Sequence, residues 1–368
     1  MRQQREAAEA GPAAPAALPR RRWRQLLTRC IVIVYLALRI STLGFTLLLP
    51  IVGAASTAGE WSTREVLWLL LMALAFHTFA YVGNDVADLE IDRSEPLRAD
   101  SPLVLGIWSR GQALALTLAQ VPLTFAAAWA AGAGPLAMVA LAAALLGMAG
   151  YNLWGKTARR PLLTDALQSA AWCALLLVGA ALADRLPGRA SAWICVYVFA
   201  AVMLVNGVHG SLRDLINDAR CGGWTTAMSL GATPSADGAV VVSATLVRYA
   251  WALQVVLVTS AHMAWHELAG RLNDALLAAA ALLVGAALSG SVVSLRRVFR
   301  TASRRQAFLS AIALNIVCTL AVLPALALPA LGWSQGALLF ALAAAPVLAM
   351  RAYNRSHWHL PNAMEGHA

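Results

Sequence analysis

The sequence has few acidic residues and almost no lysine. Only 18 of its 368 residues are Asp or Glu, and Lys156 is the one lysine among 28 basic residues. Charged residues make up 12% of the chain and hydrophobic residues 60%. A soluble domain averages about 25% charged residues, so this composition indicates a membrane protein.

Cysteine is also scarce, and strand-like alternation is missing. The five cysteines (Cys30, Cys173, Cys195, Cys221 and Cys318) are scattered without a C-x-x-C pair. Neither a disulfide framework nor a zinc site is expected from them.

The net charge of +10 could suggest a nucleic-acid partner. We expect none, because arginines gathered in loops on one side of a membrane explain the charge better.

Apolar runs of roughly 17–25 residues recur along the chain, which is the length that a helix needs to cross a bilayer. We therefore predict an all-α, polytopic membrane helical bundle of nine to ten transmembrane helices around a central cavity open to the cytoplasmic side. The expected spans are 31–54, 65–83, 112–130, 134–153, 164–183, 191–212, 239–264, 272–295, 307–330 and 335–350. Residues 1–29 are assigned to a disordered basic N-terminal tail, 30–350 to the membrane domain and 351–368 to a cytoplasmic C-terminal tail.

The basic residues divide unequally between the two sides of these spans. With the N-terminus inside, the inner segments hold 22 of the 28 Arg and Lys residues, whereas the outer loops hold four. Cytoplasmic loops carry the excess of positive charge in membrane proteins. We therefore expect a multi-pass protein of the cell (plasma) membrane with a cytoplasmic N-terminus and a site facing the cytoplasm.

Four of the scarce acidic residues fall in the ten positions from Asn84 to Arg93, directly after an apolar helix. If that helix continues, Asp85, Asp88 and Asp92 fall within roughly 60° of arc, while Glu90 points to the opposite side. Several carboxylates at a bilayer edge raise the free energy of the folded protein unless a cation binds them, so their presence indicates a functional role.

A second acidic cluster, Asp214 and Asp218, follows the sixth expected span, with Asn217 nearby. Its two carboxylates share a helical face, being four residues apart. Two acidic faces opposed across a cavity require cations between them, and Mg²⁺ typically takes one or two carboxylates plus substrate phosphates. The pattern predicts a Mg²⁺–diphosphate site at the mouth of an apolar tunnel, where a diphosphate with a long hydrocarbon tail fits. The single lysine, Lys156, lies in the inner loop between the two clusters.

These residues resemble the UbiA superfamily of intramembrane prenyltransferases over about residues 37–330. Its first motif, N-D-x-x-D-x-x-x-D, matches Asn84, Asp85, Asp88 and Asp92. Its Tyr-x-x-x-x-Lys motif matches Tyr151 and Lys156, and its second acidic motif matches the segment from Arg213 to Asp218. Arg39 resembles the arginine that opens the family's first helix.

The resemblance implies Mg²⁺-dependent transfer of a prenyl group from a prenyl diphosphate donor, usually to an aromatic or other lipophilic acceptor. It implies six ligands of Mg²⁺–diphosphate, which are Asn84, Asp85, Asp88, Asp92, Asp214 and Asp218. Lys156 and Arg213 would contact phosphate oxygens, and Tyr151 would lie near the reacting carbon. We assign catalysis to Asp88, Asp92, Asp214, Asp218 and Lys156, and substrate binding to Asn84, Tyr151, Arg213, Arg39 and Arg93.

The chain departs from the family pattern in three respects. Ser101 stands where many members have the Arg of an Arg-Pro-Leu sequence, so Arg98 or Arg110 is expected to substitute for it. Ser211 stands where many members have a further Asp, three residues before Asp214. The family usually has nine helices, and the sequence suggests ten.

Three other functions fit parts of this pattern. A membrane terpene cyclase of the same superfamily would let the carbocation attack its own chain. Transfer of a phosphoribosyl group to a polyprenyl phosphate also occurs in this superfamily. A transporter would need ionisable residues deeper in the membrane and an inverted repeat. The two acidic segments instead suggest a weak parallel repeat, because the helices that carry them lie four helices apart.

Overall fold

The structure is a computed structural model, and it describes residues 20–57, 62–95, 98–155, 158–182, 185–235, 239–269 and 274–355. Within these ranges the chain is almost entirely helical, as the sequence predicts. Its two short strands, β1 (Thr233–Pro234) and β2 (Val240–Val241), pair antiparallel with Thr233 opposite Val241. Eight of the described helices are long and apolar enough to cross a membrane, or nine if a bent pair counts as one span. The all-α membrane bundle is therefore confirmed.

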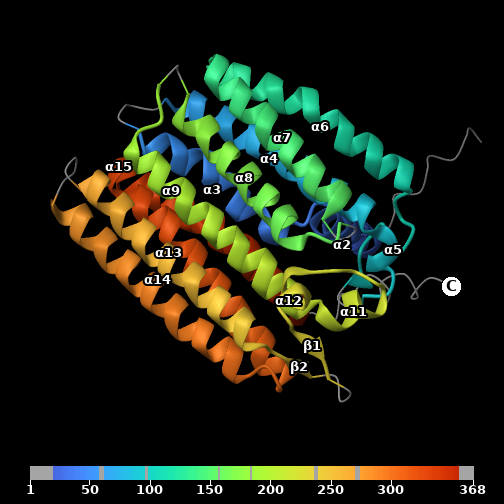
Figure 1. The fold of residues 1–368 in the computed structure, drawn as a ribbon. Coiled ribbons are helices and arrows are strands. Elements are labelled where there is room, and N and C mark those ends of the chain that lie inside the picture. The colour runs from blue at the N-terminus through green and yellow to red at the C-terminus, as the bar shows by residue number, and fades with distance from the viewer. Residues whose placement is uncertain are drawn as a thin grey trace, which may run out of the picture.

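The long helices pack side by side in a bundle (Figure 1). Helices α6 and α7 lie at one margin of this bundle, and α13 and α14 lie at the opposite margin (Figure 1). The helices are α2 (Arg20–Ala37), α3 (Ile40–Ala55), α4 (Thr63–Ala87), α5 (Leu89–Asp92), α6 (Arg110–Ala130), α7 (Pro135–Trp154), α8 (Pro161–Ala180), α9 (Arg189–Val202), η2 (Met203–Gly210), α10 (Ser211–Arg213), α11 (Leu215–Arg220), α12 (Thr226–Ser229), α13 (Ala244–Ala269), α14 (Asp274–Arg300) and α15 (Arg305–Arg355). The short helices α5, α11 and α12 lie together at the end of the bundle that also carries the β1–β2 hairpin.

The first predicted span is broken, with a bend of 55° between α2 and α3. At the bend Arg39 adopts left-handed backbone angles (φ 46°, ψ 46°), which cost an L-residue about 1–2 kcal/mol. Thr42 donates its Oγ1 hydrogen to the Arg39 carbonyl at 2.9 Å, and His77 Nε2 lies 2.9 Å from the Leu38 carbonyl oxygen. These bonds satisfy carbonyls that the interrupted helix leaves open. Residues 20–29, assigned to a disordered tail from the sequence, form the first part of α2 in the structure.

A second break lies inside α15, where Gly332 has φ 77° and ψ 175°. Such angles are open to glycine but not to residues with a side chain. Beyond the break, the segment expected as a tenth span, 335–350, contains a shorter apolar helix, Ser334–Ala345. A Cβ added to Gly44 of α3 would lie 2.8 Å from the Ala343 Cα, so this short helix packs closely against α3.

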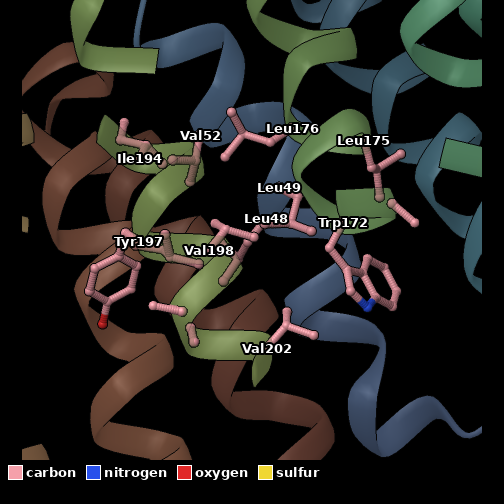
Figure 2. Packing of buried hydrophobic residues seen from close by; sticks show 14 of the residues in the cluster. Leu48, Leu49, Val52, Trp172, Leu175, Leu176, Ile194, Tyr197, Val198 and Val202 are labelled. Atoms are coloured by element: carbon pink, nitrogen blue, oxygen red, sulfur yellow. The ribbon is translucent and has the colours of Figure 1, made fainter. Parts of the chain in front are cut away.

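The core centres on α3, α8 and α9, whose apolar side chains interdigitate (Figure 2). Glycines allow α3 and α8 to approach until their backbones touch. A Cβ at Gly53 would lie 2.0 Å from the Leu176 carbonyl oxygen, and one at Gly179 would lie 1.8 Å from that of Pro50. Small residues at helix crossings are typical of membrane bundles, where close packing replaces much of the hydrophobic driving force.

Candidate functional site

A cavity of about 580 Å³ lies between α3, α4, α7, α8, the α9–η2 segment and α15. Its charged and polar lining includes Arg39, Asn84, Tyr151, Asn206 and Arg213, which stand at the helix ends nearest α5 and α11. The rest of its wall is largely apolar and comes from deeper in the bundle, with Leu48, Trp172, Ile316, Leu320, Pro324 and Phe340 among its members. A polar mouth leading into an apolar chamber suits an amphipathic molecule with an anionic head.

The first acidic segment keeps the helical phase that the sequence predicts. Helix α4 ends at Ala87, Asp88 interrupts it with φ −89° and ψ 3°, and α5 resumes at Leu89. Asp85, Asp88 and Asp92 are at most 9% exposed. By contrast, the Glu90 side chain is 74% exposed.

Arg93, assigned to substrate binding from the sequence, does not lie with the other site residues. Its guanidinium pairs with Glu90 at 2.8 Å, and its side chain is 55% exposed. The residue after Asp92 falls on the outer face of the short helix, one helical step away from the buried carboxylates. Its assignment to substrate binding stays a prediction.

Asp85 has a role that the sequence did not predict: it joins two arginines. Arg39 and Arg98 both donate to Asp85 Oδ1, and Arg98 Nε also donates to Asp92 Oδ2 at 3.1 Å. The Arg39 guanidinium lies 5.7 Å from the centre of the Tyr81 ring, which adds a cation–π contact. We name Arg39, Arg98, Asp85 and Asp92 the arginine cluster.

The arginine cluster also decides between the two expected substitutes for the arginine replaced by Ser101. Arg98 enters the cluster with its side chain 23% exposed. Arg110 begins α6 as an exposed residue. Of these two residues, Arg98 is therefore the one that contacts carboxylates of the first motif.

The second acidic segment follows a π-helix, η2, which ends directly before α10. Asp214 breaks the chain between α10 and α11 with φ −95° and ψ 1°. Both oxygens of its carboxylate accept hydrogen bonds of 2.7 Å from Arg213. Asp218, four residues on, is 2% exposed.

The structure brings the two acidic segments into direct contact. Ser94 Oγ, just beyond α5, lies 3.1 Å from Asn217 Oδ1, and Asn217 Nδ2 donates to the Ile91 carbonyl at 3.4 Å. Segments more than 120 positions apart in the sequence thus lie next to each other at one end of the bundle. The opposition of their carboxylates across a cavity stays a prediction.

A buried polar network behind Tyr151 was not predicted from the sequence. Asn206 Nδ2 donates to the Tyr151 hydroxyl at 2.9 Å and to Asp165 Oδ1 at 2.8 Å, while Thr226 donates to Asp165 Oδ2 at 2.5 Å. Because the Tyr151 oxygen accepts from Asn206, its own hydrogen remains to donate, and Tyr151 lines the cavity. The available signal was Asp165 itself, a carboxylate within an apolar span of a chain that has few carboxylates.

The oxygen ligands present fit Mg²⁺ only together with a phosphate-bearing substrate. Among the residues that the structure describes, no group of three or more His, Cys, Asp or Glu is arranged to hold a metal ion by itself. Mg²⁺ is usually held by one or two carboxylates together with substrate phosphates, so an arrangement of separate carboxylates at a cavity mouth is suitable. Lys156, expected to contact a phosphate oxygen, lies outside the described residues.

Comparison with known proteins gives one family and several solved structures. Residues 42–312 match the model of the UbiA prenyltransferase family. The fold is similar to the apo structure of a UbiA homolog from Aeropyrum pernix K1, with a TM-score of 0.58 and 18% identity over 77% of this chain and 96% of that one. It is also similar to a UbiA homolog from Archaeoglobus fulgidus bound to GPP and Mg²⁺, with a TM-score of 0.56 and 16% identity over 79% and 99% of the two chains. A search of the curated proteins finds no match.

Proposed function

Because the chain belongs to the UbiA prenyltransferase family, we propose that it transfers a prenyl group from a prenyl diphosphate to a lipophilic acceptor, in the usual case an aromatic one. The observation that supports this proposal most strongly is the contact between the two acidic segments, which contribute Asn84 and Arg213 to the lining of a largely apolar cavity. The similar Archaeoglobus fulgidus structures, bound to GPP or DMAPP together with Mg²⁺, support the donor class and the metal. The cavity volume lies within the roughly 300–1,000 Å³ typical of small-molecule sites.

The charge at the mouth explains why Mg²⁺ accompanies the donor. Among the described residues, the five carboxylates of the two motifs stand with three guanidinium groups, those of Arg39, Arg98 and Arg213. Carboxylates repel the phosphate oxygens of a diphosphate unless a cation lies between them. When bound, Mg²⁺ supplies positive charge that neutralises the phosphate oxygens of the leaving diphosphate. Asn84, Asp88, Asp92, Asp214 and Asp218 are the residues that we propose to hold it.

The remaining side chains have roles that follow from their positions. Arg213 and Arg39 line the cavity and place guanidinium donors where the diphosphate would lie, and Lys156 is proposed to add an ammonium group from the neighbouring loop. The Tyr151 hydroxyl has a hydrogen available for an oxygen of the departing diphosphate. Apolar residues deeper in the cavity exclude water, which would otherwise capture the allylic cation.

The chain is a multi-pass membrane protein, and we propose that the cavity mouth faces the cytoplasm of the plasma membrane. The mouth lies at the ends of α4 and α10, which precede loops that the distribution of basic residues assigns to the inside. The N-terminus would then be cytoplasmic as well.

The proposal is tested by measuring diphosphate release from geranyl, farnesyl and longer prenyl diphosphates with Mg²⁺. The purified protein is supplied with a membrane lipid extract that provides acceptors. Asp88→Ala and Asp214→Ala should abolish release, whereas Glu90→Ala should retain it, because Glu90 belongs to the same segment but faces outward. Retained activity in both of the first two variants would contradict the site assignment.

Product analysis separates the proposed reaction from its relatives. A prenylated acceptor supports transfer, whereas a cyclic hydrocarbon or alcohol formed without any acceptor would show a terpene cyclase. The transporter hypothesis would require Mg²⁺-dependent flux through the purified protein in liposomes.

A further inference from the structure

A second, open groove of about 620 Å³ lies on the surface of the bundle at helices α13 and α14. These two helices form the margin of the bundle opposite α6 and α7 (Figure 1). The groove combines an apolar wall with three guanidinium groups, and its lining residues are Trp251, Val292, Val293, Arg296, Arg297 and Arg300. The groove and the cavity of the proposed donor site have no lining residue in common among those described. The groove is therefore a separate feature of the molecule.

The three arginines share one face of α14 with an apolar residue. Val293 and the arginines follow the i, i+3, i+4, i+7 spacing and fall within roughly 100° of arc. All four side chains are exposed, that of Val293 to 68%. The arginines occupy the last five residues of α14, a helix long and apolar enough to cross a membrane, so they lie at its edge. The preference of basic residues for one side of the membrane explains this depth but not the common face.

A buried hydrogen bond joins the two helices at the deeper end of the groove. Gln254 of α13 donates through Nε2 to Ser291 Oγ of α14 at 2.8 Å, and both residues are 2% exposed. Gln254 follows Trp251 by three residues and Ser291 directly precedes Val292, so the bond lies within about one helical turn of the apolar wall. The Ser291 carbonyl also accepts from Asn315 of α15 at 2.6 Å. The groove thus rests on a fixed contact between three helices.

The positive charge of the groove is not offset by acidic residues of the same helices. Helix α13 has one acidic residue, Glu267, and α14 has one, Asp274, and both lie at the opposite end from the arginines. Positions 275–364 of the sequence contain no Asp or Glu. The arginines therefore attract an anionic ligand, and the exposed apolar residues beside them favour one that also has a hydrocarbon chain.

We propose that this groove binds an anionic glycerophospholipid of the surrounding membrane. The phosphodiester accepts hydrogen bonds from the guanidinium groups, whose planar donor pairs match phosphate oxygens. An acyl chain lies along Trp251 and the two valines and continues into the bilayer. Basic pockets between membrane helices bind lipid head groups in this way. The proposal goes beyond prenyl transfer and does not depend on it, because the lipid occupies the groove and not the donor cavity.

The test measures lipid binding to the full-length protein by native mass spectrometry, from mixed micelles of phosphatidylglycerol and phosphatidylcholine. The wild-type protein should retain phosphatidylglycerol in preference to phosphatidylcholine. Combining Arg296→Gln, Arg297→Gln and Arg300→Gln should lower the affinity for phosphatidylglycerol about tenfold or more, because each arginine near an anionic head group adds to the attraction. The affinity for phosphatidylcholine, which has no net charge, should stay the same.

The matched control removes the same charge from the same end of the bundle without changing the groove. Arg110→Gln, Arg159→Gln and Arg160→Gln are combined, since these three residues are exposed and lie at or before the starts of α6 and α8. This variant should keep the wild-type affinity for phosphatidylglycerol. If the groove variant does not fold, a phosphatidylglycerol with a photoactivatable acyl chain should cross-link to the wild-type segment that carries Val292 and Val293.

Three outcomes would overturn the proposal: equal retention of the two lipids by the wild-type protein, an equal loss of phosphatidylglycerol affinity in the groove variant and its control, or cross-links confined to other helices. The second outcome would show that the basic residues on this side of the membrane attract anionic lipid by their summed charge, without a site.

Discussion

Asp85 provides the sharpest test of how the site is built, because the family resemblance and the structure give it different roles. The resemblance implies a ligand of Mg²⁺–diphosphate, whereas the structure shows a carboxylate that accepts from both Arg39 and Arg98. Asp85→Asn keeps the shape of the side chain and removes its charge. If Asp85 mainly anchors the arginines, this variant should lose stability more than it loses affinity for Mg²⁺.

The size of the effect follows from the arginine cluster. With Asp85 neutral, two guanidinium groups share the single carboxylate of Asp92, at 3.1 Å from Arg98 and 3.9 Å from Arg39. The Coulomb attraction between two unit charges 4 Å apart is about 4 kcal/mol at an effective dielectric constant of 20, and the variant loses one such attraction. The arginine side chains are 20% and 23% exposed, so water recovers part of this energy. We expect a loss of about 2–3 kcal/mol in the free energy of unfolding, near the lower end of what breaking a buried pair costs.

The assay combines unfolding in detergent with a Mg²⁺ titration of diphosphate release. Asp88→Asn is the control, since Asp88 belongs to the same acidic segment, accepts a hydrogen bond from Asn84 and is not the residue that joins Arg39 to Arg98. Asp85→Asn should lower stability more than Asp88→Asn does, and Asp88→Asn should raise the Mg²⁺ midpoint more. Adding Arg98→Gln to Asp85→Asn should recover part of the lost stability, because it removes the surplus cation. Wild-type stability with a raised Mg²⁺ midpoint in Asp85→Asn would refute the reasoning.

Three further changes test other parts of the structure. Tyr151→Phe should lower kcat about tenfold or more without changing donor Kd, because it removes the hydroxyl hydrogen but not the ring; an unchanged kcat would show that the hydrogen is not used. Gly179→Ala should destabilise the protein by more than the usual 1–3 kcal/mol of overpacking, measured by unfolding in detergent, because its methyl group would meet the Pro50 backbone and not a movable side chain. Ser211→Asp should lower Tm in EDTA and recover with Mg²⁺, because it buries a carboxylate that only a cation can offset; a Tm independent of Mg²⁺ would contradict this.

The parts of the fold and site that the sequence predicted depend on local periodicity. Long apolar runs are sufficient to define spans because a lipid-exposed backbone must satisfy its own hydrogen bonds. The burial of Asp85, Asp88 and Asp92 and the exposure of Glu90 follow from helical phase, which holds across the interruption at Asp88. Arg93, assigned to substrate binding because it follows the motif directly, lies on the exposed side of the same turn, beside Glu90.

The features that the sequence could not predict depend on contacts between distant segments or on irregular backbone. The hydrogen bond between His209 and Asn315 joins residues 106 positions apart. In addition, η2 changes the helical phase, so a regular helix gives no reliable guide to which residues of Met203–Gly210 face the cavity. Arg39 was placed inside a continuous span, and its left-handed backbone has no signature in a segment without glycine or proline beside it.

The two acidic segments, for which the sequence suggests a weak parallel repeat of two halves, share a local backbone turn and differ at one position. Asp88 and Asp214 interrupt their helices with nearly equal angles, and each precedes a buried carboxylate by four residues. Three residues earlier the halves differ. Asp85 holds two arginines, whereas Ser211 Oγ donates at 3.3 Å to the Asn206 carbonyl within η2. A carboxylate at 211 would have no hydrogen for that carbonyl, so the serine suits the π-helix η2. At this position the first half thus has a carboxylate that accepts from two arginines, whereas the second half has a hydroxyl that satisfies a backbone carbonyl.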